Sequence, residues 1–88
     1  MRFEFDPTKA ASNVRKHGVS FADAEALFED PLAVHATDPD AEGEERFVAM
    51  GLGGAGEVLV VAYLLRGTVI RLISARRATK REVKAYAS

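Results

Sequence analysis

The pattern that most constrains the fold is a pair of extended segments near the C-terminus, joined by a tight turn. Residues 58–65 (VLVVAYLL) are hydrophobic at every position, which is typical of a central strand covered on both faces. Arg66-Gly67 is a turn sequence, and the β-branched residues within 68–75 predict a strand that returns beside the first. We therefore expect a sheet built around residues 58–65.

Positive charge is concentrated in and after this second strand. Residues 66–88 contain seven Lys and Arg against one acid, Glu82, for a net charge of +6, whereas residues 1–65 carry −7. The formal net charge of −1 conceals this separation. Such asymmetry is typical of a protein that binds a polyanion on one surface and a basic partner on another.

The N-terminal third predicts one strand and two helices. Residues 2–5 alternate polar and apolar, as in a short strand. Asp6-Pro7 is a helix start signal, and Gly18 is a helix end signal. The first helix would bury a stripe of Ala10, Ala11 and Val14. Ser20 begins the second helix, with Asp23 in a near capping box. Its apolar positions are Phe21, Ala24, Leu27 and Phe28.

The middle of the chain predicts further strands separated by loops. Residues 32–36 form a possible strand before the acidic loop at 37–43, and glycines in 51–56 interrupt two extended runs as a hairpin turn does. A short helix pattern begins after Thr79. The predicted class is α+β: β-α-α, then a three- to four-stranded antiparallel sheet and a short C-terminal helix. Residues 1–88 form a single domain.

Composition excludes several function classes. The chain has no cysteine, so it has no disulfide framework and no thiolate zinc site. Its longest apolar run is much shorter than the roughly 20 residues that span a bilayer, and the N-terminus lacks a signal-peptide pattern. The acids Asp38, Asp40 and Glu42 lack metal-binding spacing, and no helix pattern follows the glycines at 51–56, as a nucleotide site requires. We expect a cytoplasmic protein without metal, cofactor or membrane contact.

Several separated motifs resemble the BrnT family of toxins. In chain order they are Phe5-Asp6-Pro7 with Lys9-Ala10, then Asn13, residues 16–21 (KHGVSF), 43–47 (GEERF), 73–76 (ISAR), Ala78-Thr79 and 82–86 (EVKAY). The match spans nearly the whole chain. It departs from the family at Phe5, where Trp is frequent, and at the variable glycine turn.

The resemblance implies a RelE/ParE-like fold and a ribonuclease toxin of a type II toxin–antitoxin system. Such a toxin cleaves RNA, inhibits translation as a stress response, and is neutralised by a BrnA-like ribbon-helix-helix antitoxin. Operator DNA would be bound only by the toxin–antitoxin complex. The alternative is a non-catalytic RelE-like module that binds nucleic acid or an antitoxin in transcriptional autoregulation, because a fold does not determine an activity.

Metal-independent RNA cleavage needs a base for the 2′-OH proton, cations for the charge on phosphate and an acid for the leaving oxygen. We predict that the catalytic residues are Arg46, Arg76, Lys80, Glu82 and His17. The predicted RNA-binding residues are Lys16, Arg77, Arg81 and Lys84. Strand alternation would place Arg76 on the face of Ser74, Leu72 and Ile70, with Arg77 on the other face.

Each of the main candidates also has a structural interpretation. Arg76 would be a surface residue at the sheet end, and Glu82 would complete a capping box with Thr79 rather than act as general base. Arg46, predicted on the face of Val48 and Met50, would pair across strands with Glu44 or Glu45.

Candidates in the helices also have two interpretations. Lys16 and His17 would complement a helix C-terminus, although histidines also transfer protons near neutral pH. His35 is predicted to be a partly buried structural residue. The helix after Thr79 is short enough to be marginal alone, so we hypothesise that the antitoxin orders or displaces it.

Overall fold

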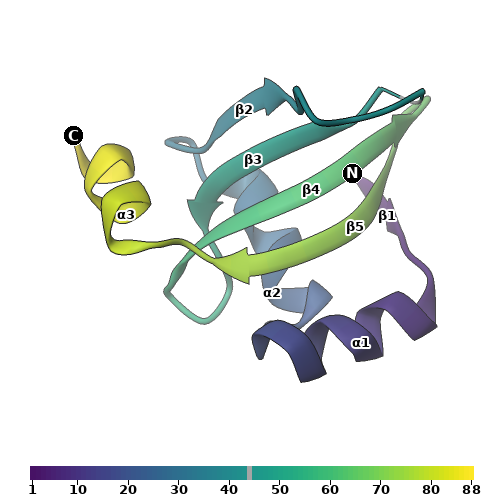
Figure 1. Cartoon of the computed structure of the whole chain (residues 1–88), viewed down its shortest axis with the longest axis horizontal. Coiled ribbons are helices and arrows are strands. Elements are labelled where there is room, and N and C mark those ends of the chain that lie inside the picture. Colours follow the sequence, from purple (N-terminus) through teal and green to yellow (C-terminus); the bar gives the residue numbers. More distant parts are fainter. Residues whose placement is uncertain (44) are drawn as a thin grey trace.

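The structure, a computed structural model, describes residues 1–43 and 45–88. In these residues helices flank a single sheet (Figure 1). The elements are β1 (Arg2–Glu4), α1 (Pro7–His17), α2 (Phe21–Ala26), the 3₁₀ turn η1 (Leu27–Glu29), β2 (Val34–Thr37), β3 (Phe47–Leu52), β4 (Val58–Arg66), β5 (Val69–Arg77) and α3 (Lys80–Ala87). The predicted α+β class is confirmed.

The described strands form a five-stranded mixed sheet in the order β1-β5-β4-β3-β2. Strands β2 to β5 pair antiparallel, whereas β1 pairs parallel with β5, with Phe3 opposite Ile70. The sheet therefore has one more strand, and one parallel pairing, than the purely antiparallel sheet predicted. A three-residue strand carries too little pattern to indicate its partner, and its partner lies at the far end of the chain.

The hydrophobic core lies between α1, α2 and one face of the sheet. Ala49, Val61 and Ala75 lie side by side on β3, β4 and β5 with no exposed surface. Gly51 extends this face, because a Cβ there would lie 2.8 Å from Ala33 Cβ. β4 is central, as predicted, but Val60 and Ala62 on its second face are only half-buried. We call this second face the open face.

Polar contacts attach α1 to the free edge of β5. β1 pairs only with residues 69–71, so it does not cover the backbone of Ala75. The buried Asn13 side chain does so instead: Nδ2 donates to Ala75 O at 2.7 Å, and Oδ1 accepts from Ala75 N at 3.0 Å. Of the predicted apolar stripe, Ala10 packs against the core, but Ala11 is exposed and Val14 is 49% exposed, so the prediction is wrong for these two residues.

A β-bulge changes the faces of β5. Ala62 lies opposite Ser74, but Tyr63 lies opposite Leu72, so Ile73 is an extra residue. Ser74 and Arg76 consequently share the open face, while Leu72 packs in the core. The predicted common face of Arg76, Ser74 and Leu72 is wrong, because simple alternation does not hold across a bulge.

Candidate active site

One face of α1 is polar and turns towards the end of β5. Asp6 caps the helix by accepting from Thr8 N at 2.8 Å, and Gly18 ends it in the left-handed conformation, as predicted. Five polar residues recur at the spacing of a single helical face: Lys9, Ser12, Asn13, Lys16 and His17. With Ile73 and Ser74 of β5 they line a hollow of about 150 Å³.

A second hollow adjoins the first. It has a volume of about 210 Å³, and it is lined by Lys9, Ala41, Glu42, Arg46, Leu64 and Ile73. Lys9 and Ile73 line both hollows, so we treat the two as one cleft, called here the α1 cleft. The cations on its rim, among them Lys9 and Arg46, suit a phosphate.

Arg46 is held at one end of the α1 cleft by an acid of the preceding loop. Its Nε donates to Asp38 Oδ2 at 2.8 Å, and Asp38 N donates back to Arg46 O at 2.7 Å. The N–H of Asp40, and then Arg46, hold the pKa of the Asp38 carboxyl below its usual value. The predicted pairing was with Glu44 or Glu45; Glu44 lies outside the described residues, and the partner found is Asp38.

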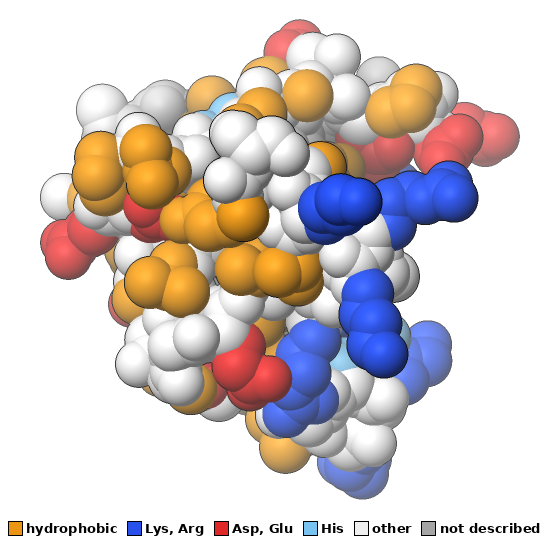
Figure 2. All heavy atoms as spheres, turned by 90° about the vertical axis from the view of Figure 1, so that its left-hand side faces the viewer, with side chains coloured by type: hydrophobic (Ala, Val, Ile, Leu, Met, Phe, Trp, Pro, Cys, Tyr) orange, Lys and Arg blue, Asp and Glu red, His pale blue; other side chains and the backbone are white. Residues whose placement is uncertain are grey.

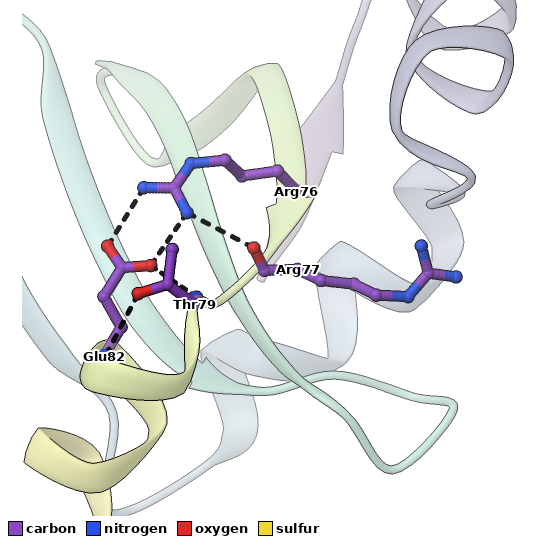
Figure 3. A network of polar contacts seen from close by, with 4 residues as sticks. All are labelled: Arg76, Arg77, Thr79 and Glu82. Carbon is purple, nitrogen blue, oxygen red and sulfur yellow. Dashed lines mark hydrogen bonds and ion pairs between the residues drawn. The ribbon is translucent and has the colours of Figure 1, made fainter.

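Arg76 and Glu82 form a two-point ion pair between β5 and α3 (Figure 3). Arg76 Nη1 lies 2.8 Å from Oε1, and Nη2 lies 3.0 Å from Oε2. Glu82 also accepts from Thr79 N at 2.8 Å, while Glu82 N donates to Thr79 Oγ1 at 3.2 Å. The predicted capping box is confirmed.

These contacts change the acidity of Glu82. Arg76, followed by the Thr79 amide, lowers its pKa from 4.5 to about 2. Both carboxylate oxygens are already bonded, and a carboxylate with so low a pKa is a weak proton acceptor near neutral pH. Its role as general base stays a prediction, while its role as a cap is observed.

The candidate cations occupy different parts of the open face. Ser74 lines the α1 cleft, and Arg76 follows it on the same face. Arg46 precedes β3 and lies about level with Leu64 of β4, whereas Arg76 lies opposite Val60. The two arginines are therefore offset by about four residues along the strand direction, roughly 13 Å, and they are further separated by the width of β4. Figure 2 shows Lys and Arg side chains in a curved row, with a histidine side chain among them.

Arg77 points away from Arg76, as predicted (Figure 3). It donates to His17 O at 2.9 Å and pairs with Glu57 Oε2 at 3.0 Å, so it ties the end of α1 to the β3–β4 turn. The side chains of Lys80, Arg81 and Lys84 are exposed on α3, without an ion pair to any other described residue. RNA contacts by these residues stay predictions.

Other predicted features lie away from the α1 cleft. His35 is exposed on the edge strand β2 rather than partly buried, although its Nδ1 lies 2.8 Å from the Tyr63 hydroxyl. Across residues 1–43 and 45–88, His, Asp and Glu side chains form no group of three that would hold a metal. None of the described helices has the length and apolar character needed to cross a bilayer.

Lys9, Ser12 and Ser74 line the candidate site but were not predicted from the sequence. The i, i+3, i+4, i+7, i+8 spacing of polar residues from Lys9 to His17 was a usable signal, because it describes one helical face as clearly as an apolar stripe does. Ser74 carried no such signal, since its direction depends on the bulge in β5.

The fold and the α1 cleft define a small α+β protein with a basic site suited to nucleic acid. The chain belongs to the BrnT family, because residues 5–82 match the family described as the ribonuclease toxin BrnT of type II toxin–antitoxin systems. No curated protein matches the sequence.

A solved structure supports the family assignment. The crystal structure of the Brucella abortus ribonuclease toxin BrnT superposes with a TM-score of 0.69 at 28% sequence identity, over 91% of this chain and 99% of that chain. The predicted family and function are thus confirmed: the protein is a ribonuclease toxin of a type II toxin–antitoxin system, which implies endoribonuclease activity, an RNA substrate and an antitoxin partner.

Proposed function

We propose that this toxin cleaves RNA without a metal ion in the α1 cleft and thereby inhibits translation. The supporting observation is the polar face of α1, which brings Lys9, Lys16 and His17 against Ser74 of β5. This arrangement combines an imidazole, which can accept and donate a proton, with two cations, and those are the requirements of metal-free phosphate chemistry.

In this mechanism His17 accepts the proton of the 2′-OH as the 2′-oxygen attacks phosphorus. The bond from phosphorus to the 5′-oxygen breaks, and the leaving oxygen takes a proton from a lysine ammonium of the cleft. The products are a 2′,3′-cyclic phosphate and a 5′-hydroxyl. Lys9 and Lys16 stabilise the charge that builds on the phosphate, while Arg46 and Arg76 bind neighbouring phosphates.

Glu82 with Lys80 is the second arrangement for proton transfer. It would place the base beside Arg76 rather than in the α1 cleft. We favour His17, because Arg76 and Thr79 already occupy both oxygens of Glu82. Arg81 and Lys84 then attract RNA at longer range without contacting a phosphate, whereas Arg77 faces the opposite side.

The same proposal includes the fold superfamily, the type of antitoxin and the binding of operator DNA. By resemblance, the fold is RelE/ParE-like, the antitoxin is a BrnA-like ribbon-helix-helix protein, and operator DNA is bound only by the complex. The toxin would act in the cytoplasm as part of a stress response. The alternative, a non-catalytic module of the same fold, would use the same cations to bind nucleic acid without cutting it.

Cleavage of end-labelled RNA by the purified toxin, with and without EDTA, tests the proposal. We expect cleavage in EDTA, with products that end in a cyclic phosphate. His17→Ala should lower the rate roughly 10² to 10⁴-fold, whereas His35→Ala, which changes the other histidine, should leave it unchanged. Loss of cleavage in EDTA would show metal dependence, and folded toxin that binds RNA without cutting it would support the non-catalytic module.

Arg76→Ala tests the phosphate contact in cells. Expressed without antitoxin, this variant should fold but no longer arrest growth, because it removes a cation from the row on the open face. The matched control is Arg15→Ala, which removes an exposed α1 arginine outside the α1 cleft. Growth arrest at the wild-type level by folded Arg76→Ala would remove Arg76 from the site.

A further inference from the structure

An apolar groove lies between the open face and α3. It has a volume of about 420 Å³, and its floor is formed by Val34, Ala36, Val48, Met50 and Val60. These residues come from β2, β3 and β4 and lie side by side across the sheet. Figure 2 shows hydrophobic side chains gathered on this side of the molecule, next to the row of cations. We call this feature the α3 groove.

The α3 groove is not closed by α3 itself. None of the residues of α3 is buried, although Arg81, Glu82 and Ala85 line the groove. Two polar contacts hold the helix in place: the pair of Glu82 with Arg76, and the hydrogen bond from the Tyr86 hydroxyl to Asp30. The apolar floor therefore remains open to a partner that brings its own apolar side chains.

The rim of the groove adds charge and an exposed edge. Arg81 lines the groove, and Lys80 and Lys84 share its short helix, without an ion pair to any described residue. β2 is one of the two edge strands of the described sheet, and all four of its residues are exposed, Val34 by 59%. A partner for this surface needs apolar side chains flanked by carboxylates.

We propose that the α3 groove binds an amphipathic, acidic segment of the antitoxin, an inference that rests on the toxin–antitoxin function given above. Apolar side chains of that segment fill the floor, and its carboxylates pair with Arg81, the cation of α3 that lines the groove. RNA does not match the floor, because proteins bind RNA bases by stacking them on aromatic rings and by hydrogen bonds, and the floor has neither aromatic rings nor polar side chains. A second copy of this chain does not match the rim, because a symmetric pair would bring together two α3 helices that each carry Lys80, Arg81 and Lys84.

The position of the groove explains how the bound segment would inhibit cleavage. Glu82 lines the groove and forms an ion pair with Arg76. Arg76 lies on the same face as Ser74, which lines the α1 cleft, so the groove and the cleft are connected through Arg76. A segment seated against Glu82 and Arg81 thus lies across one end of the RNA path. The antitoxin blocks RNA entry from the α3 side without filling the pocket of His17.

Affinity measurements with the co-expressed and purified cognate antitoxin test this site. Val34→Glu places a carboxylate on the exposed edge of the floor, and Arg81→Glu reverses the charge of the rim. Each should weaken antitoxin binding at least tenfold. The matched controls are Leu65→Glu, at a position 52% exposed at the far end of β4, and Arg15→Glu on α1; both should stay within twofold. Circular dichroism verifies that each variant folds. If Val34→Glu does not fold, Val34→Ser replaces it.

RNA cleavage by the same variants separates this proposal from the proposed function. Val34→Glu should still cut RNA but resist inhibition by the antitoxin. Unchanged antitoxin affinity in both groove variants would overturn the groove proposal, whereas the proposed function would stand as long as Val34→Glu still cuts RNA. Light scattering on the toxin alone tests whether a second copy of the chain occupies the groove. Self-association that Val34→Glu abolishes would assign the groove to a second copy and would also overturn the proposal.

Discussion

At the scale of single residues, Glu82 connects two elements through one carboxylate. It bonds to the start of α3 through Thr79 N and to β5 through Arg76. A cap and an ion pair satisfy the same group, so a structural role accounts for all of its contacts. Catalysis by Glu82 would require that it leave both partners.

Replacing Glu82 with Gln separates these roles. Gln at the third helical position keeps capping-box geometry but loses the charge that pairs with Arg76. We expect a loss of about 1 kcal/mol in the free energy of unfolding, because solvent screens this partly exposed pair. Cleavage per folded molecule should be unchanged, with Glu29→Gln as control. A rate lower by roughly 10² to 10⁴-fold, at unchanged stability, would instead make Glu82 the general base.

The same pair predicts a pH dependence of stability. The pKa of Glu82 is about 2 in the folded protein, below its ordinary value of 4.5. The unfolded chain therefore binds the proton more tightly, and stabilisation by Glu82 is complete above about pH 4.5 and disappears as the pH falls towards 2. Urea unfolding should show that the free energy of unfolding falls more steeply below about pH 4.5 for the wild type than for Glu82→Gln. Parallel profiles would show that the pair contributes nothing.

Asn13 determines where α1 sits. In Asn13→Ala the N–H and C=O of Ala75 and the C=O of Val19 lose their partner in the interior. Buried polar groups left unsatisfied cost about 1 to 3 kcal/mol each, so we expect a loss on the order of 3 kcal/mol in the free energy of unfolding. Ser12→Ala, on the same helical face, should cost under about 0.5 kcal/mol. Urea denaturation of both variants measures the difference; near-equal values would argue against the Asn13 contact.

At the scale of elements, α3 and β4 are stabilised in opposite ways. β4 is hydrogen-bonded on both sides, and its residues Leu59, Val61 and Tyr63 are in the core. α3 has eight residues, none of them buried, and its ends depend on the capping box and on Tyr86. Helices this short are marginal in water without tertiary packing.

Hydrogen exchange should detect this contrast. In the free toxin, amides of residues 80–87 should exchange within minutes, while those of residues 59–63 stay protected. In the antitoxin complex, exchange in residues 80–87 should slow, because the α3 groove is then filled. Protection of α3 equal to that of β4 in the free toxin would make the helix a fixed part of the core, contrary to the hypothesis that it is regulated.

At the scale of the whole molecule, charge is arranged by surface rather than by segment. The acidic N-terminal part of the sequence supplies Lys9 and Lys16 to the α1 cleft, and Arg46 joins them from the loop before β3. The basic C-terminal part supplies Arg76 on the same face, but it directs Arg77 to the opposite side. Folding therefore brings these cations together from distant parts of the sequence.

The salt dependence of RNA affinity should show how many of these cations contact phosphates. Each phosphate neutralised on single-stranded RNA contributes a slope of roughly −0.7 to the logarithm of affinity against the logarithm of salt. Four contacts, from Lys9, Lys16, Arg46 and Arg76, would give a slope near −3. Fluorescence anisotropy with the His17→Ala variant measures binding without cleavage, and Lys16→Ala added to it should reduce the slope by about 0.7. An unchanged slope would exclude Lys16 from the interface.

The sequence by itself determined the local features. Asp6, Ser20 and Thr79 cap their helices as predicted, and Gly18 ends α1, because a cap depends only on residues within a few positions of the helix end. The hydrophobic run at 58–65 also identified the central strand. The family motifs, spread along the chain, indicate the function without any tertiary structure.

Only the tertiary structure decided which of these residues meet. Asn13 reaches Ala75 across 62 positions of sequence, and β1 pairs with the last strand. The bulge at Ile73 sets the face of Arg76, and the partner of Arg46 is Asp38. The physical reason is the same in each case: strand register, bulges and edge contacts depend on the free energy of packing distant segments, and no short stretch of sequence contains that information.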